Sequence, residues 1–277
     1  MKVRVNTATK LLSTWAKRSD TQYEPLIKVW NSPKGNRRHL LKGYKAAPRQ
    51  HHFLSDGEKR AGIYYESLPS VIDYFEQYPL LDLERAIRIA AEMNIRYPTN
   101  YNDGEAYVLS TDLLCREYDS DTHDIVFVAR SYKPLDSLDF QSKHPVSLNR
   151  TFEKLELERR YYEELGIRFE LVTDANISKT CAYNLKYFRN AAWLKHEYIA
   201  HQERFIRELM NTWFAKPDVP FNQLLPALIP KLGLSYSDLE MLFDYCAWSH
   251  AIPVDLEVKF HRFRPLTLRT EKGRRDV

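Results

Sequence analysis

The sequence is poor in the residues that mark secreted, zinc-binding or membrane proteins. Cysteine occurs three times in 277 residues, at widely separated positions and without a C-x-x-C pair: Cys115, Cys181 and Cys246. This scarcity argues against a disulfide framework and a zinc knuckle, and it favours a cytoplasmic protein with reduced thiols. No apolar run approaches the length of a membrane span, so we expect no membrane role. The eight glycines form no phosphate-binding loop, which argues against ATPase activity in this chain.

Positive charge is concentrated at the two ends of the chain. Residues 1–52 contain twelve Lys or Arg against two Asp or Glu, and residues 259–277 contain seven against two, although the formal net charge of the whole chain is only +4. The middle is therefore net acidic. This uneven distribution of charge favours a polyanion partner that binds the two ends of the chain. Basic arms that only aid solubility would have the same composition. We expect the first basic arm to contact DNA through Lys34, Arg37, Arg38, His39, Lys42, Lys45 and Arg49.

Hydrophobic periodicity predicts an α/β core in the first part of the chain. Helical spacing is found at about residues 9–18, 56–66, 82–94 and 152–165. Extended patterns are found at about residues 23–29, 70–79 and 168–173, and residues 107–132 have the pattern of a β-hairpin. This alternation predicts a mixed β-sheet flanked by helices.

From about residue 174 the pattern becomes helical. Apolar stripes predict one long helix at 198–213, a second at 224–229 and a third at 239–247, the last with capping residues at 235–238. A strand is expected at 254–258, and three helices followed by a strand is a winged-helix-like outline. We therefore divide the chain into a basic arm and loop at 1–52 that belongs to the first domain, an α/β core at 53–175, and a mainly helical domain with a basic tail at 176–277.

Four polar residues stand in the order acid, acid, small polar, lysine: Glu58, Asp112, Ser131 and Lys133. Asp112 lies on the first strand of the predicted hairpin, and Lys133 follows the second. Because side chains alternate along a strand, Ser131 and Lys133 share one face, and Lys133 can stand beside the carboxylate of the partner strand. Metal-dependent nucleases of the restriction-endonuclease type use this order of residues.

The residue types suit phosphodiester hydrolysis. Carboxylates hold Mg²⁺, which polarises the phosphoryl oxygen and lowers the pKa of the attacking water, while a lysine stabilises developing negative charge. Each residue also has an ordinary explanation. Glu58 ends the capping box Ser-Asp-Gly-Glu at 55–58, Asp112 is explained equally as an edge aspartate, and Lys133 before Pro134 as the end of a strand.

Five stretches around these residues resemble the TnsA family, the endonuclease subunit of heteromeric cut-and-paste transposases. They are HHFLSDGE at 51–58, FEQYPLL at 75–81, LSTDLL at 109–114, YKP at 132–134 and RTFEKLELERRYY at 150–162. The resemblance, which runs from about residue 23 to 174, implies a restriction-endonuclease-like core of the PD-(D/E)xK type. It places the catalytic set on Glu58, Asp112 and Lys133. Ser131 stands where the better-known members have a glutamine, and the main-chain carbonyl of Tyr132 is a further metal ligand that could fill the gap.

What the resemblance implies is a Mg²⁺-dependent endonuclease, with Mn²⁺ as a substitute, that cleaves the 5′ strands at transposon ends. A TnsB-like transposase and a TnsC-like ATPase, the latter bound by the C-terminal domain, would be its partners, in the bacterial cytoplasm on the nucleoid. Two alternatives stay open: a stand-alone restriction or junction nuclease, and a non-catalytic DNA-binding adaptor in which Ser131 marks a degraded site. Glu158, in the last stretch, is expected to be a solvated charge on a helix face.

Overall fold

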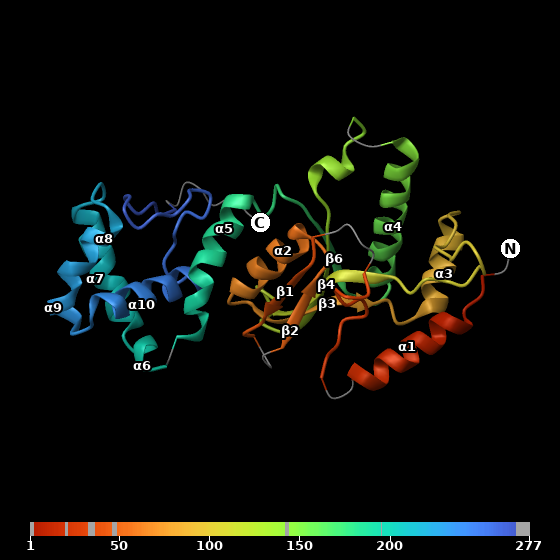
Figure 1. The fold of residues 1–277 in the computed structure, drawn as a ribbon, viewed down its shortest axis with the longest axis horizontal. Helices are drawn as coiled ribbons and strands as arrows, with labels where there is room; N and C mark the ends of the chain where they lie inside the picture. The colour runs from red at the N-terminus through yellow and green to blue at the C-terminus, as the bar shows by residue number, and fades with distance from the viewer. Residues whose placement is uncertain are drawn as a thin grey trace. The chain divides into compact units, whose positions relative to one another are not determined.

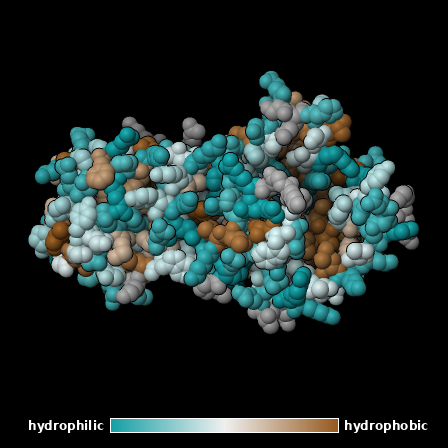
Figure 2. All heavy atoms as spheres, in the orientation of Figure 1, coloured by the Kyte–Doolittle hydropathy of each residue, from teal (hydrophilic) through white to brown (hydrophobic). Residues whose placement is uncertain are grey.

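A computed structural model describes residues 3–19, 22–32, 37–45, 49–141, 144–194 and 196–269. The chain divides into two compact units, residues 1–66 with 70–176 and residues 67–69 with 177–277. Figure 1 shows the elements of each unit. Among the described residues, no helix combines the length and the apolar character needed to cross a bilayer. On the face seen in Figure 2, hydrophilic side chains predominate and apolar side chains form small groups.

A four-stranded mixed sheet forms the centre of the first unit, in the order β3 (Val71–Pro79), β4 (Ser110–Tyr118), β5 (Ile125–Tyr132) and β6 (Arg168–Val172). The pairs β3–β4 and β4–β5 are antiparallel, whereas β5 and β6 are parallel. A separate two-stranded sheet pairs β1 (His39–Lys42) with β2 (Gln50–Phe53). The predicted mixed α/β core is confirmed, while residues 23–29, expected to be extended, form no strand, and β1 and β2 were not predicted.

Helices cover both faces of this sheet (Figure 1): α1 (Asn6–Ser19), α2 (Asp56–Ser67), α3 (Leu83–Glu92) and α4 (Pro145–Glu163), with a short 3₁₀ helix η1 (Leu135–Leu138) before α4. The caps explain two starts, because Asp82 accepts a hydrogen bond from the main-chain N–H of Arg85, and Pro145 stands in the first turn of α4. The apolar core joins Ile89 of α3 and Leu157 of α4 to Leu114 and Ala129 of the sheet. Burial of each large side chain stabilises the fold by roughly 1.5–3 kcal/mol.

The second unit is helical, as predicted. Its elements are α5 (Lys179–Phe188), η2 (Arg189–Trp193), α6 (His196–Ile199), α7 (Gln202–Ala215), α8 (Phe221–Leu224), η3 (Leu225–Leu228), α9 (Ile229–Leu232) and α10 (Tyr236–Trp248). An aromatic core joins Phe188, Phe221, Phe243 and Phe260. The capping box of α10 forms between Ser235 and Asp238.

Three details of the second unit differ from the predictions. The long helix expected at 198–213 is broken after Ile199, and the helix expected at 224–229 is a series of short turns. Residues 254–258 form no strand, since Val254 makes a single bridge with Leu268. Leu224 of the short α8 is buried, as are Leu225 and Leu228 of η3, so tertiary packing rather than regular helix geometry stabilises this segment.

Candidate active site

The β4–β5 hairpin brings Asp112, Ser131 and Lys133 together. Leu113 pairs with Arg130, so the next positions along the two strands are Asp112 and Ser131. The Asp112 carboxylate accepts a hydrogen bond from the main-chain N–H of Tyr132 at 2.7 Å and one from the Lys133 Nζ at 3.3 Å. Lys133 Nζ also donates to the Tyr132 carbonyl at 2.8 Å. The ammonium group therefore lies between two oxygens that the sequence marked as metal ligands.

Burial of Lys133 opposes its positive charge, but the carboxylates around it decide the outcome. Asp112 and then Glu158 raise the pKa of Lys133 above its ordinary value. The side chain therefore stays charged at neutral pH and stabilises negative charge that develops beside it.

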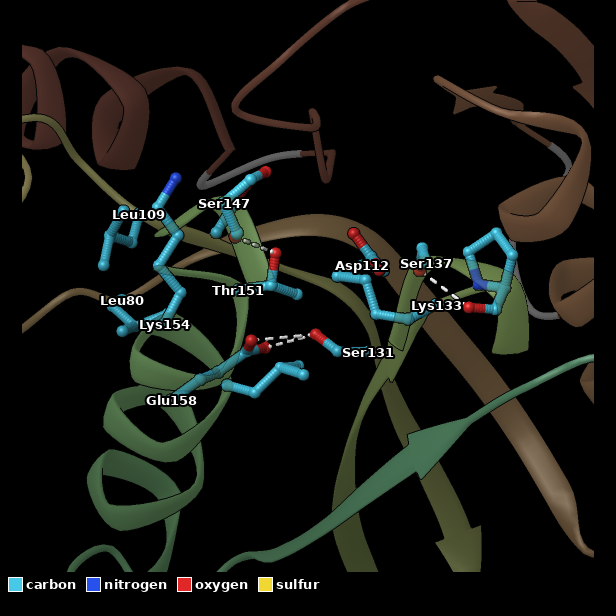
Figure 3. Close-up of a pocket in the computed structure, with 13 residues that line it drawn as sticks. Leu80, Leu109, Asp112, Ser131, Lys133, Ser137, Ser147, Thr151, Lys154 and Glu158 are labelled. Atoms are coloured by element: carbon cyan, nitrogen blue, oxygen red, sulfur yellow. Dashed lines mark hydrogen bonds and ion pairs between the residues drawn. The ribbon is translucent and has the colours of Figure 1, made fainter. Parts of the chain in front are cut away.

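Glu158 is part of this group, and the expectation of a solvated Glu158 is wrong. Ser131 Oγ lies 2.8 Å from both Glu158 carboxylate oxygens, and Figure 3 shows the two side chains facing each other. The residue is 9% exposed. Burial and then repulsion from Asp112 raise the pKa of Glu158 to about 7. The missed signal is its spacing from Leu155 and Tyr162, which places Glu158 on the apolar face of α4.

Glu58 approaches from the first turn of α2. Ser55 Oγ accepts from the main-chain N–H of Glu58 at 3.1 Å and donates to its Oε1 at 3.0 Å, while Oε2 accepts from the main-chain N–H of Leu54 at 2.8 Å. The Ser55 side chain therefore caps the helix as predicted. The Glu58 carboxylate, however, accepts from the main-chain N–H of Leu54 and not from that of Ser55. Burial, followed by repulsion from Asp112, raises the pKa of Glu58 to about 7. The capping and site interpretations of Glu58 are thus compatible.

Contacts of Tyr132 hold α2 against the end of β5. A Cβ atom added to Gly57 would lie 1.9 Å from the Tyr132 ring, so the close approach requires glycine at this position. Arg60 Nη2 donates to the Tyr132 hydroxyl at 2.8 Å. The helix that carries Glu58 is therefore fixed to the residue whose main chain bonds both Asp112 and Lys133.

A cavity of about 430 Å³ opens over this group (Figure 3). It is lined by Asp112, Ser131, Lys133 and Glu158 together with Ser147, Thr151 and Lys154 of α4 and several neighbouring residues. Glu58 is not among the lining residues. Lys154, which sequence reasoning did not select, adds an exposed second cation to the cavity wall. The cavity therefore combines acidic and basic groups, as a site for a metal ion and a phosphate requires.

The donor set fits a divalent metal ion. The Asp112 carboxylate and the Tyr132 carbonyl already converge on one cation, the Lys133 ammonium, and both are hard oxygen donors of the kind that Mg²⁺ prefers. Across the described ranges, no three His, Cys, Asp or Glu side chains are grouped so that they could hold a metal ion. An ion here would therefore be held by few protein ligands, with water and phosphate supplying the rest, as is usual for Mg²⁺.

The basic arm is exposed only in part. Arg37 and Arg38 are exposed, as is Lys42, whereas His39 is half-buried. Asp56 binds two of these groups, Arg37 Nη1 at 3.1 Å and His39 Nε2 at 2.7 Å. Lys34 lies outside the described residues. Arg37 and His39 therefore lie at the start of α2, whereas Arg38 Nη1 donates to the Val29 carbonyl at 2.6 Å and Lys42 lies at the far end of β1.

Two side chains that were predicted to contact DNA, Arg49 and Lys45, bond groups within the protein instead. The guanidinium group of Arg49 is buried, donating to the Glu76 carboxylate at 2.8 Å and to the Tyr74 carbonyl at 2.6 Å. Lys45 Nζ donates to the Val71 carbonyl, and burial lowers the pKa of Lys45 to about 8. Basic composition did not distinguish these residues from the exposed ones, because the distinction depends on β3 packing against the arm.

Comparison with known proteins relates part of the chain to one family. Residues 68–174 match a family described as TnsA-like endonuclease, N terminal. This stretch contains β3 to β6 and α4, and with them Asp112, Lys133 and Glu158, whereas Glu58 lies before it. Residues 68–174 are therefore a TnsA-like endonuclease domain, and the two matches support assigning the chain to the TnsA family. It is 32% identical over 167 residues to the transposon Tn7 transposition protein TnsA of Escherichia coli, an alignment covering 60% of this chain and 55% of that protein. The TnsA resemblance is thereby confirmed, and the chain spans about half the length of this relative.

Proposed function

We propose that this TnsA-family chain is a metal-dependent DNA endonuclease that cleaves the 5′ strands at transposon ends, with Mg²⁺ as the ion and Mn²⁺ as a substitute. The observation that carries the proposal is the convergence of Asp112, Lys133 and the Tyr132 carbonyl beside a cavity of about 430 Å³. The family match supplies the reaction class.

Each residue has a distinct task in this proposal. A bound metal ion would polarise the phosphoryl oxygen and lower the pKa of the attacking water. The main-chain N–H of Tyr132 orients the Asp112 carboxylate, and Asp112 lines the cavity. Lys133 neutralises charge that develops on the phosphate. Glu58 is the second carboxylate ligand, and the Ser131–Glu158 pair places a carboxylate close to the position of the family's glutamine.

Partners follow from the family and from the surfaces of the chain. Double-stranded DNA would contact the exposed arm residues Arg37, Arg38 and Lys42, with Lys154 at the cavity edge. A TnsB-like transposase and a TnsC-like ATPase would complete the reaction. We assign the ATPase contact to the second unit, a domain of about residues 176–277, which exposes large apolar side chains: Trp193, Phe214 and Phe263.

The decisive experiment removes Asp112. We expect Asp112→Ala to lower cleavage of labelled 5′ strands at least about 10³-fold in a mixture containing DNA, Mg²⁺ and the partner proteins, because the carboxylate that organises the site is lost. DNA binding, measured by fluorescence anisotropy, should be unchanged. Asp121→Ala, in the exposed β4–β5 turn of the same hairpin, is the matched control.

Three results would contradict or redirect the proposal. Cleavage retained by Asp112→Ala contradicts it. Cleavage of naked DNA by the isolated chain would indicate the stand-alone nuclease. Absence of Mn²⁺ binding by the wild-type chain, even with DNA present, would indicate the non-catalytic adaptor.

A further inference from the structure

A strained glutamine lies next to the candidate site. Gln77, inside β3, has a φ of 50°, in the left-handed region that non-glycine residues seldom occupy. Its side chain is buried, with 3% of the residue exposed. Such a conformation persists only where surrounding contacts offset the strain, and it is concentrated at functional sites.

The side-chain amide of Gln77 bridges two elements of the site. Its Nε2 donates to Glu58 Oε2 at 3.2 Å, and its Oε1 accepts a hydrogen bond from Ser110 Oγ at 3.0 Å. Ser110 is the first residue of β4 and lines the cavity. Because Ser110 donates to the amide oxygen, the amide nitrogen is directed to the carboxylate of Glu58.

The strand register explains why the backbone is unusual here. Glu76 pairs with Leu113 and Tyr78 with Thr111, so Gln77 lies across from Asp112. In a regular strand the side chains of Gln77 and Asp112 would share one face. With its left-handed backbone, Gln77 instead directs its side-chain amide to Glu58 on α2. The Gln77 amide therefore joins Glu58 to Ser110 at the start of β4, two residues before Asp112.

We propose that Gln77 is a positioning residue: it fixes the orientation of the Glu58 carboxylate, and Ser110 fixes the orientation of the Gln77 amide. This inference rests on the proposed function, in which Glu58 is a metal ligand. Hydrogen-bond partners of ligating groups typically change metal affinity or activity 10- to 100-fold when they are removed.

The main test is Gln77→Asn. Asparagine tolerates the left-handed backbone well, but its amide is one methylene shorter and does not reach Glu58. We expect kcat for 5′-strand cleavage to fall 10- to 100-fold with KM for DNA unchanged, and Mn²⁺ affinity measured by calorimetry to weaken about 10-fold. The Tm should stay within about 4 °C of the wild type.

Two further variants separate positioning from backbone strain. Gln77→Gly, which removes the strain and the amide together, should lose kcat and Mn²⁺ affinity as Gln77→Asn does. His123→Gly is the matched control, since His123 has a φ of 60° in the exposed β4–β5 turn. It should keep wild-type cleavage and Mn²⁺ binding.

A double-mutant cycle tests the role of Ser110. Ser110→Ala should lower kcat about 3- to 10-fold. If Ser110 acts through Gln77, the Gln77→Asn/Ser110→Ala double variant should be no worse than Gln77→Asn alone. Losses that multiply would overturn this part of the inference.

Other outcomes are equally clear. Wild-type kcat and Mn²⁺ affinity in Gln77→Asn would overturn the inference, as would a loss that disappears when activity is expressed per folded molecule. A wild-type chain that neither cleaves DNA nor binds Mn²⁺ would instead contradict the proposed function.

Discussion

The first unit has two acidic sites whose surroundings have opposite effects on carboxylate pKa: Glu76 on β3, and the carboxylates of Glu58, Asp112 and Glu158 near the cavity. Glu76, which is fully buried, accepts hydrogen bonds from Arg49 and from the main-chain N–H of His52, and its carboxylate lies 2.9 Å from His51 Nδ1. Burial alone would raise the pKa of Glu76, but the contacts with His51 and Arg49 lower it to about 2.

Around the cavity the balance is reversed. Glu58 and Glu158 have pKa values raised to about 7 by burial and by Asp112, and the cation bonded to the group is Lys133. A buried carboxylate that serves the fold is neutralised by fixed partners, whereas this group keeps an excess of acidic side chains. The difference shows that the carboxylates around Asp112, unlike Glu76, are not fully neutralised by the cations that the structure describes.

The strongest test of this contrast neutralises one carboxylate at each of the two acidic sites. Glu76→Gln should destabilise the metal-free protein by about 3 kcal/mol, because it leaves Arg49 buried without its counter-charge. Glu158→Gln should change the free energy of unfolding by less than about 1 kcal/mol, because it also removes repulsion from Asp112. Urea unfolding at pH 7 measures both values. Equal losses in the free energy of unfolding would show that Glu76 and Glu158 contribute to stability in the same way.

Acid stability sharpens the same contrast. The folded-state pKa of Glu76, about 2, lies below its ordinary value of 4.5. Its contribution to stability is therefore complete above about pH 4.5 and is lost as the pH falls from there toward about 2. We expect the wild type to lose up to about 3 kcal/mol in that window through this group. Glu76→Gln should lack this part of the decline; identical pH profiles in urea unfolding would contradict the assignment.

The smallest expected effect concerns the second cation of the cavity. Lys154→Ala should raise KM for DNA about 3- to 10-fold with little change in kcat, since an exposed lysine at the cavity edge contributes to phosphate binding more than to chemistry. Lys186→Ala, on α5 in the second unit, is a control of equal charge. A fall in kcat without a change in KM would place Lys154 in the chemical step.

Local patterns predicted those elements whose residues alternate or repeat without interruption. The β4–β5 hairpin and α3 are of this kind. Strand β3 was predicted from its β-branched and aromatic residues, although a bulge after Val71 and the left-handed Gln77 interrupt its alternation. Helix α5 was missed because its buried face includes Asn184, a polar residue whose side chain bonds the main chain of residues 256 to 260. The break between α6 and α7 likewise has no marking proline or glycine.

The sequence by itself determined that Asp112, Ser131 and Lys133 share a face at one end of a hairpin, because strand geometry repeats every two residues. It also identified the TnsA family. Only the tertiary structure decided that Ser131 bonds Glu158, that Gln77 bonds Glu58, and that Arg49 pairs with Glu76. Burial and charge pairing join elements far apart in the chain, so the role of an acidic or basic side chain depends on neighbours that no local pattern contains.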